Sequence, residues 1–212
     1  QEIVFDGSGE EPITDEERAE FAENWGKITA PDGVDKIMAE VEPQLAEVKP
    51  QVIINPAAYT AVDKAEAEPD LAGAINAIAP RVFGEEAARL GMLVIHYSTD
   101  YVFDGSKAGA YLETDVPNPQ SVYGQTKLAG EQALQASGAD HLIFRTSWVF
   151  GAHGANFAKT MLRLAAERDG LKIVADQFGA PTSAALLADV TAQVLGRYKR
   201  EGRAGFPFGL YH

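Results

Sequence analysis

Short apolar runs alternate with stretches of helical periodicity along most of the chain. Runs with the length of buried strands occupy residues 1–6, 51–55, 92–98, 141–150 and 171–176. Apolar positions at three- and four-residue spacing predict helices over residues 15–24, 32–48, 68–91, 121–138, 156–170 and 184–200. Short apolar strands between helices are typical of a parallel sheet covered on both faces. The pattern therefore predicts an α/β, three-layer, doubly wound fold of Rossmann type.

Proline and glycine refine two of these helices. Pro80 lies inside the predicted helix 68–91 and predicts a kink or break there, because proline lacks the backbone N–H that a helix interior uses. Gly91 and Gly138 follow two predicted helices at positions suited to left-handed C-caps.

One strand ends in an unusual run of polar side chains. The stretch "VIHYSTDYVFDG" (94–105) begins apolar and then carries Ser98, Thr99, Asp100 and Tyr101 at the predicted strand end. A short polar loop would explain this run. The alternative is a ligand site, since open α/β sheets bind ligands at the carboxyl ends of their strands.

A second group of interest opens the predicted helix 121–138. Tyr123 and Lys127 are four residues apart, so both side chains project from one helix face. A lysine ammonium near a phenol lowers the pKa of the phenol, and a phenol so tuned can give a proton to a developing alkoxide. Alone, the pair is weak evidence, because a half-buried aromatic and a solvated charge are common in helices. Its position after the polar strand end brings in Thr99 as a third candidate.

Composition and charge narrow the function classes. The 212 residues include 46% hydrophobic and 23% charged residues, as in ordinary globular proteins. A net charge of −13 disfavours nucleic-acid partners, and no apolar run is long enough for a membrane span. The absence of cysteine excludes disulfides and thiolate sites, and the four histidines share no metal-ligand spacing. We expect a cytoplasmic protein without a metal site, and leave a homodimer open.

Several longer stretches of the sequence resemble those of a known protein family. Tyr-x-x-x-Lys with an upstream Ser/Thr resembles the extended short-chain dehydrogenase/reductase superfamily. The strings "NPAAYTAVDKAEAEP" (55–69), "HYSTDYVFDG" (96–105), "YGQTKLAGE" (123–131), "FRTSWVFG" (144–151), "NFAKTML" (156–162) and "DQFGAPT" (176–182) together resemble the dTDP-4-dehydrorhamnose reductase family. The resemblance implies reduction of the 4-keto group of dTDP-4-dehydro-L-rhamnose by NADPH or NADH, in nucleotide-sugar biosynthesis.

The resemblance also implies a role for each matching residue. Tyr123 would donate the proton, Lys127 would tune it and hold the nicotinamide ribose, and Thr99 would support the reacting oxygen. Asp100 and Trp148 would contact the nucleotide-sugar substrate together with Thr99. The cofactor would be lined by Ala58, Tyr59, Thr60, Tyr97, Tyr123, Lys127 and Asp6.

The chain departs from the family pattern at both ends. No strand with a glycine-rich turn precedes residues 1–6, and the match stops within the smaller C-terminal substrate domain. We therefore expect one NAD(P)-binding Rossmann-like domain over residues 1–212, with an acidic insertion at 7–26 and incomplete substrate-side elements from about 176 to 212. The intact Thr99, Tyr123 and Lys127 favour an enzyme, although the chain as it stands could be inactive. A non-catalytic regulatory or binding subunit of the same fold, or another nucleotide-sugar reductase or epimerase, remains the alternative.

Overall fold

The computed structural model of the chain describes residues 39, 43–154, 156–170, 172–173 and 177–212. The predicted strand 1–6, the helix 15–24 and the acidic insertion 7–26 lie outside the described residues. The chain divides into two compact units, residues 1–47 and 48–212. Residues 43–48 are helical, in line with the end of the predicted helix 32–48. The second unit contains all of the elements described below.

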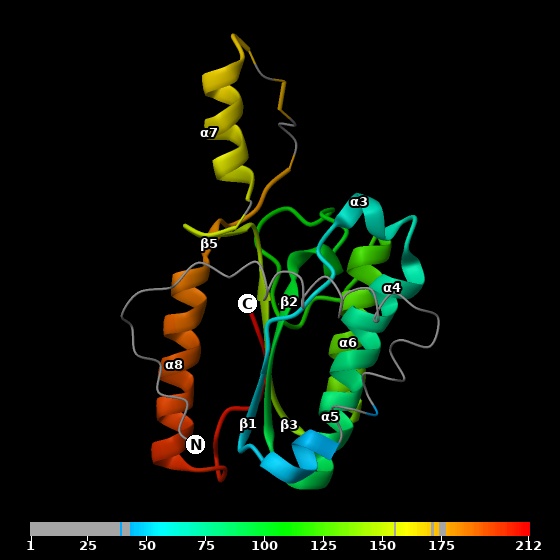
Figure 1. The fold of residues 1–212 in the computed structure, drawn as a ribbon, viewed down its shortest axis with the longest axis vertical. Coiled ribbons are helices and arrows are strands. Elements are labelled where there is room, and N and C mark those ends of the chain that lie inside the picture. The colour runs from blue at the N-terminus through cyan, green and yellow to red at the C-terminus, as the bar shows by residue number, and fades with distance from the viewer. Residues whose placement is uncertain (1–38, 40–42, 155, 171, 174–176) are drawn as a thin grey trace. The chain divides into compact units, whose positions relative to one another are not determined.

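Four parallel strands form the sheet of the second unit, in the order β1-β2-β3-β6 (Figure 1). They are β1 (Val52–Asn55), β2 (Leu93–Thr99), β3 (Asp140–Thr146) and β6 (Gly209–Tyr211). Asn55 is in register with His96, and Thr99 with Thr146, so polar strand ends meet at one edge. The α/β Rossmann-like fold predicted from the sequence is confirmed.

The helices of the second unit follow the predicted order, with the short α3 in addition. The α-helices are α3 (Val62–Ala65), α4 (Pro69–Gly73), α5 (Ala79–Leu90), α6 (Val122–Ala136), α7 (Phe157–Glu167) and α8 (Ala184–Glu201). A π-helix η1 (Ala74–Ile78), a 3₁₀ turn η2 (Asp100–Val102) and the strands β4 (Val149–Phe150) and β5 (Thr182–Ser183) complete the set. No helix among the described residues is long and apolar enough to cross a bilayer.

The kink or break predicted inside residues 68–91 takes the form of a change of helix type, without an interruption of the helix. The segment passes from α4 through the π-helix η1 into α5, and Pro80 lies in the first turn of α5, directly after the π-helix. Gly91 ends α5 with a left-handed φ of 71°.

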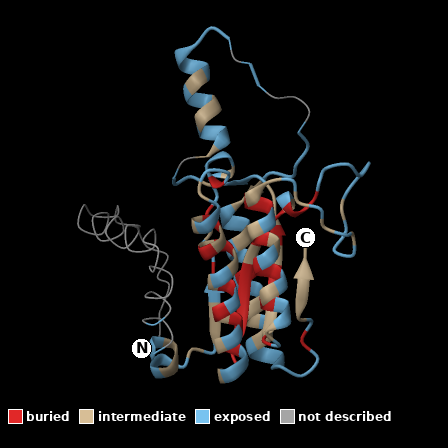
Figure 2. Ribbon diagram, turned by 90° about the vertical axis from the view of Figure 1, so that its right-hand side faces the viewer, coloured by how far each residue is buried: buried red, intermediate tan, exposed pale blue. Residues whose placement is uncertain are grey.

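The core lies on both faces of the sheet because side chains alternate along each strand. Val94 and Ile143 pack against Ala87 of α5 and Leu134 of α6. Leu93, Ile95 and Leu142 pack on the opposite face with Phe206 and with Val194, Leu195 and Tyr198 of α8. Figure 2 shows this buried layer in red, running along the central strands and the helix faces turned toward them.

Two predicted strands differ from the structure. The predicted strand 141–150 ends at Thr146, because Trp148 adopts a left-handed backbone with φ 46°, which no strand tolerates. Val149 and Phe150 instead form β4, which pairs with β5 in a separate parallel two-stranded sheet. Of the predicted strand 171–176, only residues 172–173 are described, and they are not in a strand.

The C-terminal segment contains a strand that the sequence did not predict. Residues 209–211 form β6, which pairs with β3 in the main sheet. Within the segment expected to begin the substrate-side elements, α8 covers one face of this sheet. The pattern missed β6 because three residues with a glycine at the first position are too short for a periodicity signal.

Candidate active site

The first turn of helix α6, which contains Tyr123, is held in place by two hydrogen bonds. Ser121 caps the helix, and its Oγ accepts a hydrogen bond from the Gly124 N–H at 3.1 Å. The Val122 N–H donates to Glu66 Oε1 at 2.8 Å, so a second free backbone donor is satisfied. These contacts fix the first turn of α6, which contains Tyr123.

Two glycines allow α6 to pack closely on its neighbours. A Cβ at Gly124 would overlap the carbonyl oxygen of Tyr101, and a Cβ at Gly130 would overlap that of Asn76. Glycine is required at both positions because backbone approaches the helix there. The pair brings Tyr123 and Lys127 against η2 and η1.

Tyr123 and Thr99 meet at the end of β2. Tyr123 is 9% exposed and packs edge-on against the Tyr101 ring at 5.4 Å. Burial raises the pKa of the Tyr123 phenol, and a hydrogen bond with Thr99 opposes that shift. The sequence predicted a pKa lowered by Lys127. The structure instead gives the phenol a raised pKa, because the desolvation of its ionised form outweighs any stabilising neighbour.

Lys127 is buried and its ammonium group contacts β2. It is 1% exposed, and its Nζ donates to the Tyr97 carbonyl oxygen at 2.7 Å. The Nζ also lies 3.3 Å from His96 Nε2. Burial lowers the pKa of Lys127 to about 8, although Glu131 favours the charged form. Lys127 therefore titrates close to physiological pH.

Asp100 and Trp148 lie at the ends of β2 and β3. Asp100 Oδ2 accepts from the Ser147 hydroxyl at 2.6 Å, and its Oδ1 accepts from Thr99 Oγ1 at 3.2 Å. Trp148 is 45% exposed, and a Cβ at Gly179 would lie only 2.6 Å from its indole ring. The structure thus links Asp100 directly to Thr99, and leaves Trp148 as an exposed aromatic surface held against Gly179.

The loop after β1 holds the next three predicted residues in different ways. Tyr59 is 4% exposed, packs in one core cluster with Tyr123, and donates its hydroxyl to Glu68 Oε2 at 2.6 Å. Ala58 is half-buried and Thr60 is exposed. Only Ala58 and Thr60 therefore offer side-chain surface to a ligand, while Tyr59 supports the loop from below.

Asn76 fixes this loop and was not found from the sequence. Its Oδ1 accepts from the Tyr59 N–H at 2.8 Å, and its Nδ2 donates to the Tyr59 carbonyl at 3.0 Å and to Thr126 Oγ1 at 3.2 Å. Asn76 is fully buried in the π-helix η1. A polar residue within "AINAI" (74–78) was the available signal, because a buried amide requires partners.

Two other predicted cofactor residues are placed apart from this group. Tyr97 turns to the α8 face of the sheet, where its hydroxyl lies 2.5 Å from Thr191 Oγ1. Its carbonyl, rather than its ring, contacts Lys127. Asp6 lies outside the described residues.

A buried ion pair joins α6 to β3, one helical turn after Lys127. Arg145 of β3 forms two hydrogen bonds to Glu131, with Nε–Oε1 at 2.9 Å and Nη2–Oε2 at 2.6 Å. The side chains are only 5% and 1% exposed. Sequence analysis missed this pair, although Glu131 follows Lys127 at the spacing of one helical turn.

The end of β2 contains a buried polar atom without a hydrogen-bond partner. Ser98 Oγ is buried and has no hydrogen-bond partner, and it is the only such buried side-chain oxygen or nitrogen among the described residues. Ser98 directly precedes Thr99 in β2 and is two residues after His96, so the side chains of Ser98 and His96 lie on the same face of the strand. An unpaired oxygen beside Thr99 in the strand fits a nicotinamide cofactor bound at this edge. The described residues contain no cluster of three metal-ligating side chains.

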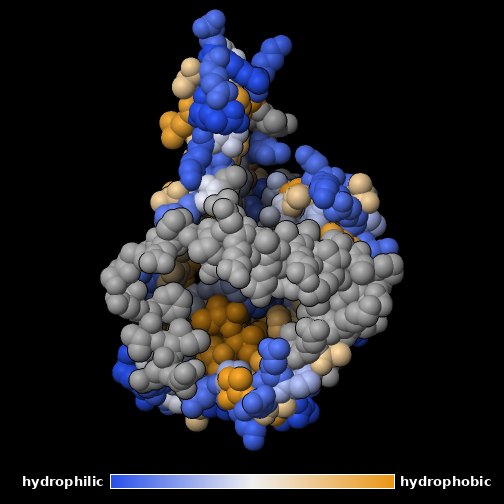
Figure 3. Space-filling model, in the orientation of Figure 1, coloured by the Kyte–Doolittle hydropathy of each residue, from blue (hydrophilic) through white to orange (hydrophobic). Residues whose placement is uncertain are grey.

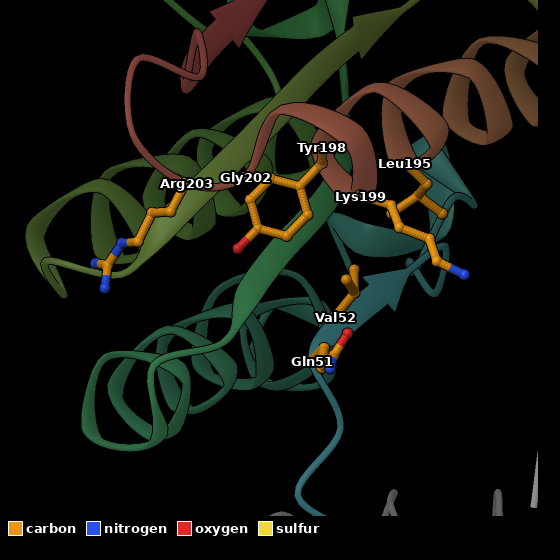
Figure 4. A pocket seen from close by; sticks show the side chains of 7 residues that line it. All are labelled: Gln51, Val52, Leu195, Tyr198, Lys199, Gly202 and Arg203. Atoms are coloured by element: carbon orange, nitrogen blue, oxygen red, sulfur yellow. The ribbon is translucent and has the colours of Figure 1, made fainter.

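A hollow among the described residues lies away from this group of side chains. Its volume is about 370 Å³, and it is lined by residues at the start of β1 and the end of α8, among them Val52, Leu195 and Tyr198. Figure 4 shows Lys199 and Arg203 extending from it in opposite directions. Because it lies at the amino end of β1, it contains none of the predicted site residues.

Comparison with known proteins gives consistent results. The family model described as the RmlD substrate binding domain matches residues 16–212. A dTDP-4-dehydrorhamnose reductase of Shigella flexneri is 51% identical over 187 residues, covering 88% of this chain and 59% of the relative. One from Escherichia coli strain K12 is 54% identical over 170 residues, covering 80% and 54%. The chain thus spans between half and three-fifths of the length of these curated relatives.

Solved structures show the same likeness. The crystal structure of a dTDP-4-dehydrorhamnose reductase from Clostridium acetobutylicum has a TM-score of 0.74 at 42% identity, and covers 87% of this chain and 60% of that one. The corresponding structure from Bacillus anthracis, in complex with NADP, has a TM-score of 0.71 at 38% identity, with 87% and 61% covered.

Proposed function

Because the chain belongs to the family of the RmlD substrate binding domain, we propose that it carries the reducing site of a dTDP-4-dehydrorhamnose reductase. The reaction is reduction of the 4-keto group of dTDP-4-dehydro-L-rhamnose to dTDP-L-rhamnose, with NADPH or NADH. The observation that carries this proposal is the meeting of Thr99 and Tyr123 at the carboxyl end of β2, with Lys127 buried one turn further along α6.

Tyr123, Thr99 and Lys127 have different roles in the proposed reduction. A bound nicotinamide cofactor would supply the hydride to C4. The Tyr123 phenol is protonated at neutral pH, and burial raises its pKa further, so it holds the proton that the developing C4 oxygen needs. With substrate bound, Thr99 would turn its hydroxyl from Asp100 Oδ1 to donate toward the same oxygen, and buried Lys127, on the same helix as Tyr123, would supply positive charge to the site.

Substrate and cofactor contacts come from the surrounding strand ends. Asp100 is held by Thr99 and Ser147, so its carboxylate has a fixed direction for a sugar hydroxyl. Trp148 offers an exposed aromatic face for the nucleotide sugar. Ala58 and Thr60 line the cofactor side, on a loop held by Asn76. The absence of cysteine supports a cytoplasmic setting.

The test separates binding from turnover. NADPH and then NADH are titrated calorimetrically into the 212-residue chain, and reduction of dTDP-4-dehydrorhamnose is followed by cofactor absorbance. Tyr123→Phe is expected to bind cofactor like the unmodified chain and to lose about 10²–10⁴-fold in turnover, the range for a missing general acid. Lys127→Met is expected to weaken both.

The matched control removes a phenol elsewhere. Tyr198→Phe changes the hollow beside α8, remote from Thr99, and should leave binding and turnover unchanged. Full turnover by Tyr123→Phe would overturn the proposal. Cofactor binding without any turnover of the unmodified chain would support a non-catalytic member of the fold instead.

A further inference from the structure

Three polar side chains from three elements are stacked under the proposed site. Asn55 ends β1, His96 lies beside it on β2, and Lys127 comes from α6. They are 5%, 0% and 1% exposed. Asn55 Nδ2 lies 3.1 Å from His96 Nδ1, and His96 Nε2 lies 3.3 Å from Lys127 Nζ. The proposed roles above leave Asn55 and His96 without a function.

The first residues of the loop after β1, which we call the cofactor-side loop, determine which atoms donate and which accept in these hydrogen bonds. The Ala57 N–H donates to Asn55 Oδ1 at 3.2 Å, which orients the amide with its NH₂ group toward His96. His96 Nδ1 must then accept. Burial and the neighbouring Lys127 cation lower the pKa of His96 to about 3, and a hydrogen bond with the Asn55 backbone opposes this shift without cancelling it, so the ring is neutral and has a single N–H. That N–H is on Nε2, the atom that faces Lys127.

Because few other groups act on Lys127, the position of the His96 proton affects the charge state of Lys127. Its Nζ donates to the Tyr97 carbonyl from β2. Glu131, one turn along α6, favours the ammonium, but Arg145 of β3 already neutralises that carboxylate. Tyr123, one turn back, is uncharged at neutral pH. A ring N–H directed at Nζ repels an ammonium, whereas a neutral amine accepts a hydrogen bond from it.

We propose that Asn55 and His96 are positioning residues that present an N–H, and not a lone pair, to Lys127, and thereby favour release of its proton. The Ala57 N–H, the Asn55 amide and the His96 ring all donate in the same direction, from the cofactor-side loop to Lys127. This inference uses the proposed function only for its consequence: Lys127 is the lysine of the reductase site, so the chain sets where activity falls at alkaline pH.

The first experiment observes the tautomer directly. The 212-residue chain is labelled with ¹⁵N-histidine, and ring nitrogens are assigned from long-range ¹H–¹⁵N correlations, with His96→Gln identifying the His96 signals among four histidines. At pH 7 we expect a protonated Nε2 and an unprotonated Nδ1. A protonated Nδ1, or a doubly protonated ring, would overturn the proposal. The readout needs neither cofactor nor turnover, so it is independent of the reductase assay.

The second experiment reverses the chain. In Asn55→Asp the carboxylate accepts from Nδ1–H, so Nε2 presents a lone pair to Lys127 and stabilises its ammonium. The pKa of Lys127, read from ¹³Cε-lysine chemical shifts, is measured for the unmodified chain, Asn55→Asp, His96→Leu and the double variant. The double-mutant cycle separates an effect through His96 from the direct field of the new carboxylate.

The cycle has a clear expected result. Asn55→Asp should raise the pKa of Lys127 by about one unit more with His96 present than with His96→Leu, the scale of one hydrogen bond to an ionised group. Active protein should then keep its activity to correspondingly higher pH. An equal rise in both backgrounds would show that His96 relays nothing and would overturn the proposal. If Asn55→Asp does not fold, the tautomer measurement still decides it.

Discussion

Two regions supply the side chains of the proposed site, and they are built differently. Around β2 and α6, Thr99, Tyr123 and Lys127 are each less than one-tenth exposed, and Lys127 Nζ donates a hydrogen bond to the Tyr97 carbonyl. In the segment from Trp148 to Ser183, no described residue is buried. Phe157, Leu162 and Phe178 in that segment are 64%, 74% and 93% exposed. Figure 3 shows apolar side chains at the surface of the α7 segment, among hydrophilic ones.

The difference reflects what each region is proposed to do. Proton transfer depends on desolvated groups with perturbed pKa values, and burial around α6 provides them. Recognition of a nucleotide sugar depends on accessible apolar and aromatic surface, and the exposed Trp148 and its neighbours provide that. Substitutions should therefore have large structural effects around α6 and small ones in the α7 segment.

The largest contrast is expected between two ion pairs. Glu131→Gln leaves Arg145 charged and buried without its partner, which should cost about 3–5 kcal/mol of unfolding free energy. Arg163→Gln in α7 removes an exposed pair with Glu167 and should change stability by less than about 0.5 kcal/mol. Urea unfolding monitored by circular dichroism measures both. Similar losses for the two variants would show that the α6 region does not depend on its buried pair.

A pH-dependent contrast should follow from His96. Its folded-state pKa is about 3 and its ordinary value is 6.5, so between these values the unfolded chain binds one more proton. Stability is then fully retained above pH 6.5 and falls with decreasing pH by up to about 1.4 kcal/mol per unit. Between pH 6 and pH 4 this amounts to roughly 2–3 kcal/mol.

The matched variant for this prediction is His96→Gln, which cannot titrate. Urea midpoints at pH 4, 5 and 6 should fall less steeply for His96→Gln than for the unmodified chain. Parallel pH profiles would mean that His96 does not remain neutral in the folded protein.

The smallest of the three contrasts compares two glycines. Gly130→Ala forces the α6 backbone away from the Asn76 carbonyl, and this strain, offset in part by the better helix propensity of alanine, should cost about 1–2 kcal/mol. Gly170→Ala meets no neighbouring atom and should lie within about 0.5 kcal/mol of the unmodified chain. Thermal unfolding of the two variants provides the measurement. A neutral Gly130→Ala would show that α6 and η1 can separate without cost.

Much of the fold was predictable because local patterns specify it. The alternation of apolar runs and helical periodicity predicted the parallel sheet, and the kink or break predicted at Pro80 corresponds to the change of helix type within residues 68–91. The strand 141–150 was extended too far because nothing in its apolar pattern signals the left-handed backbone at Trp148. Strand β6 was missed because its pairing with β3 joins residues far apart in the chain.

The sequence by itself determined which residues share an element: Tyr123 and Lys127 lie on one helix because their spacing matches its turn, and Thr99 ends a strand because polar residues follow an apolar run. Only the tertiary structure decided which of them touch. Lys127 contacts His96 and the Tyr97 carbonyl rather than Tyr123, and Asn76 holds the loop at Tyr59. Helical and strand periodicity act over a few residues, whereas these contacts depend on strand register and on the close approach that Gly124 and Gly130 permit.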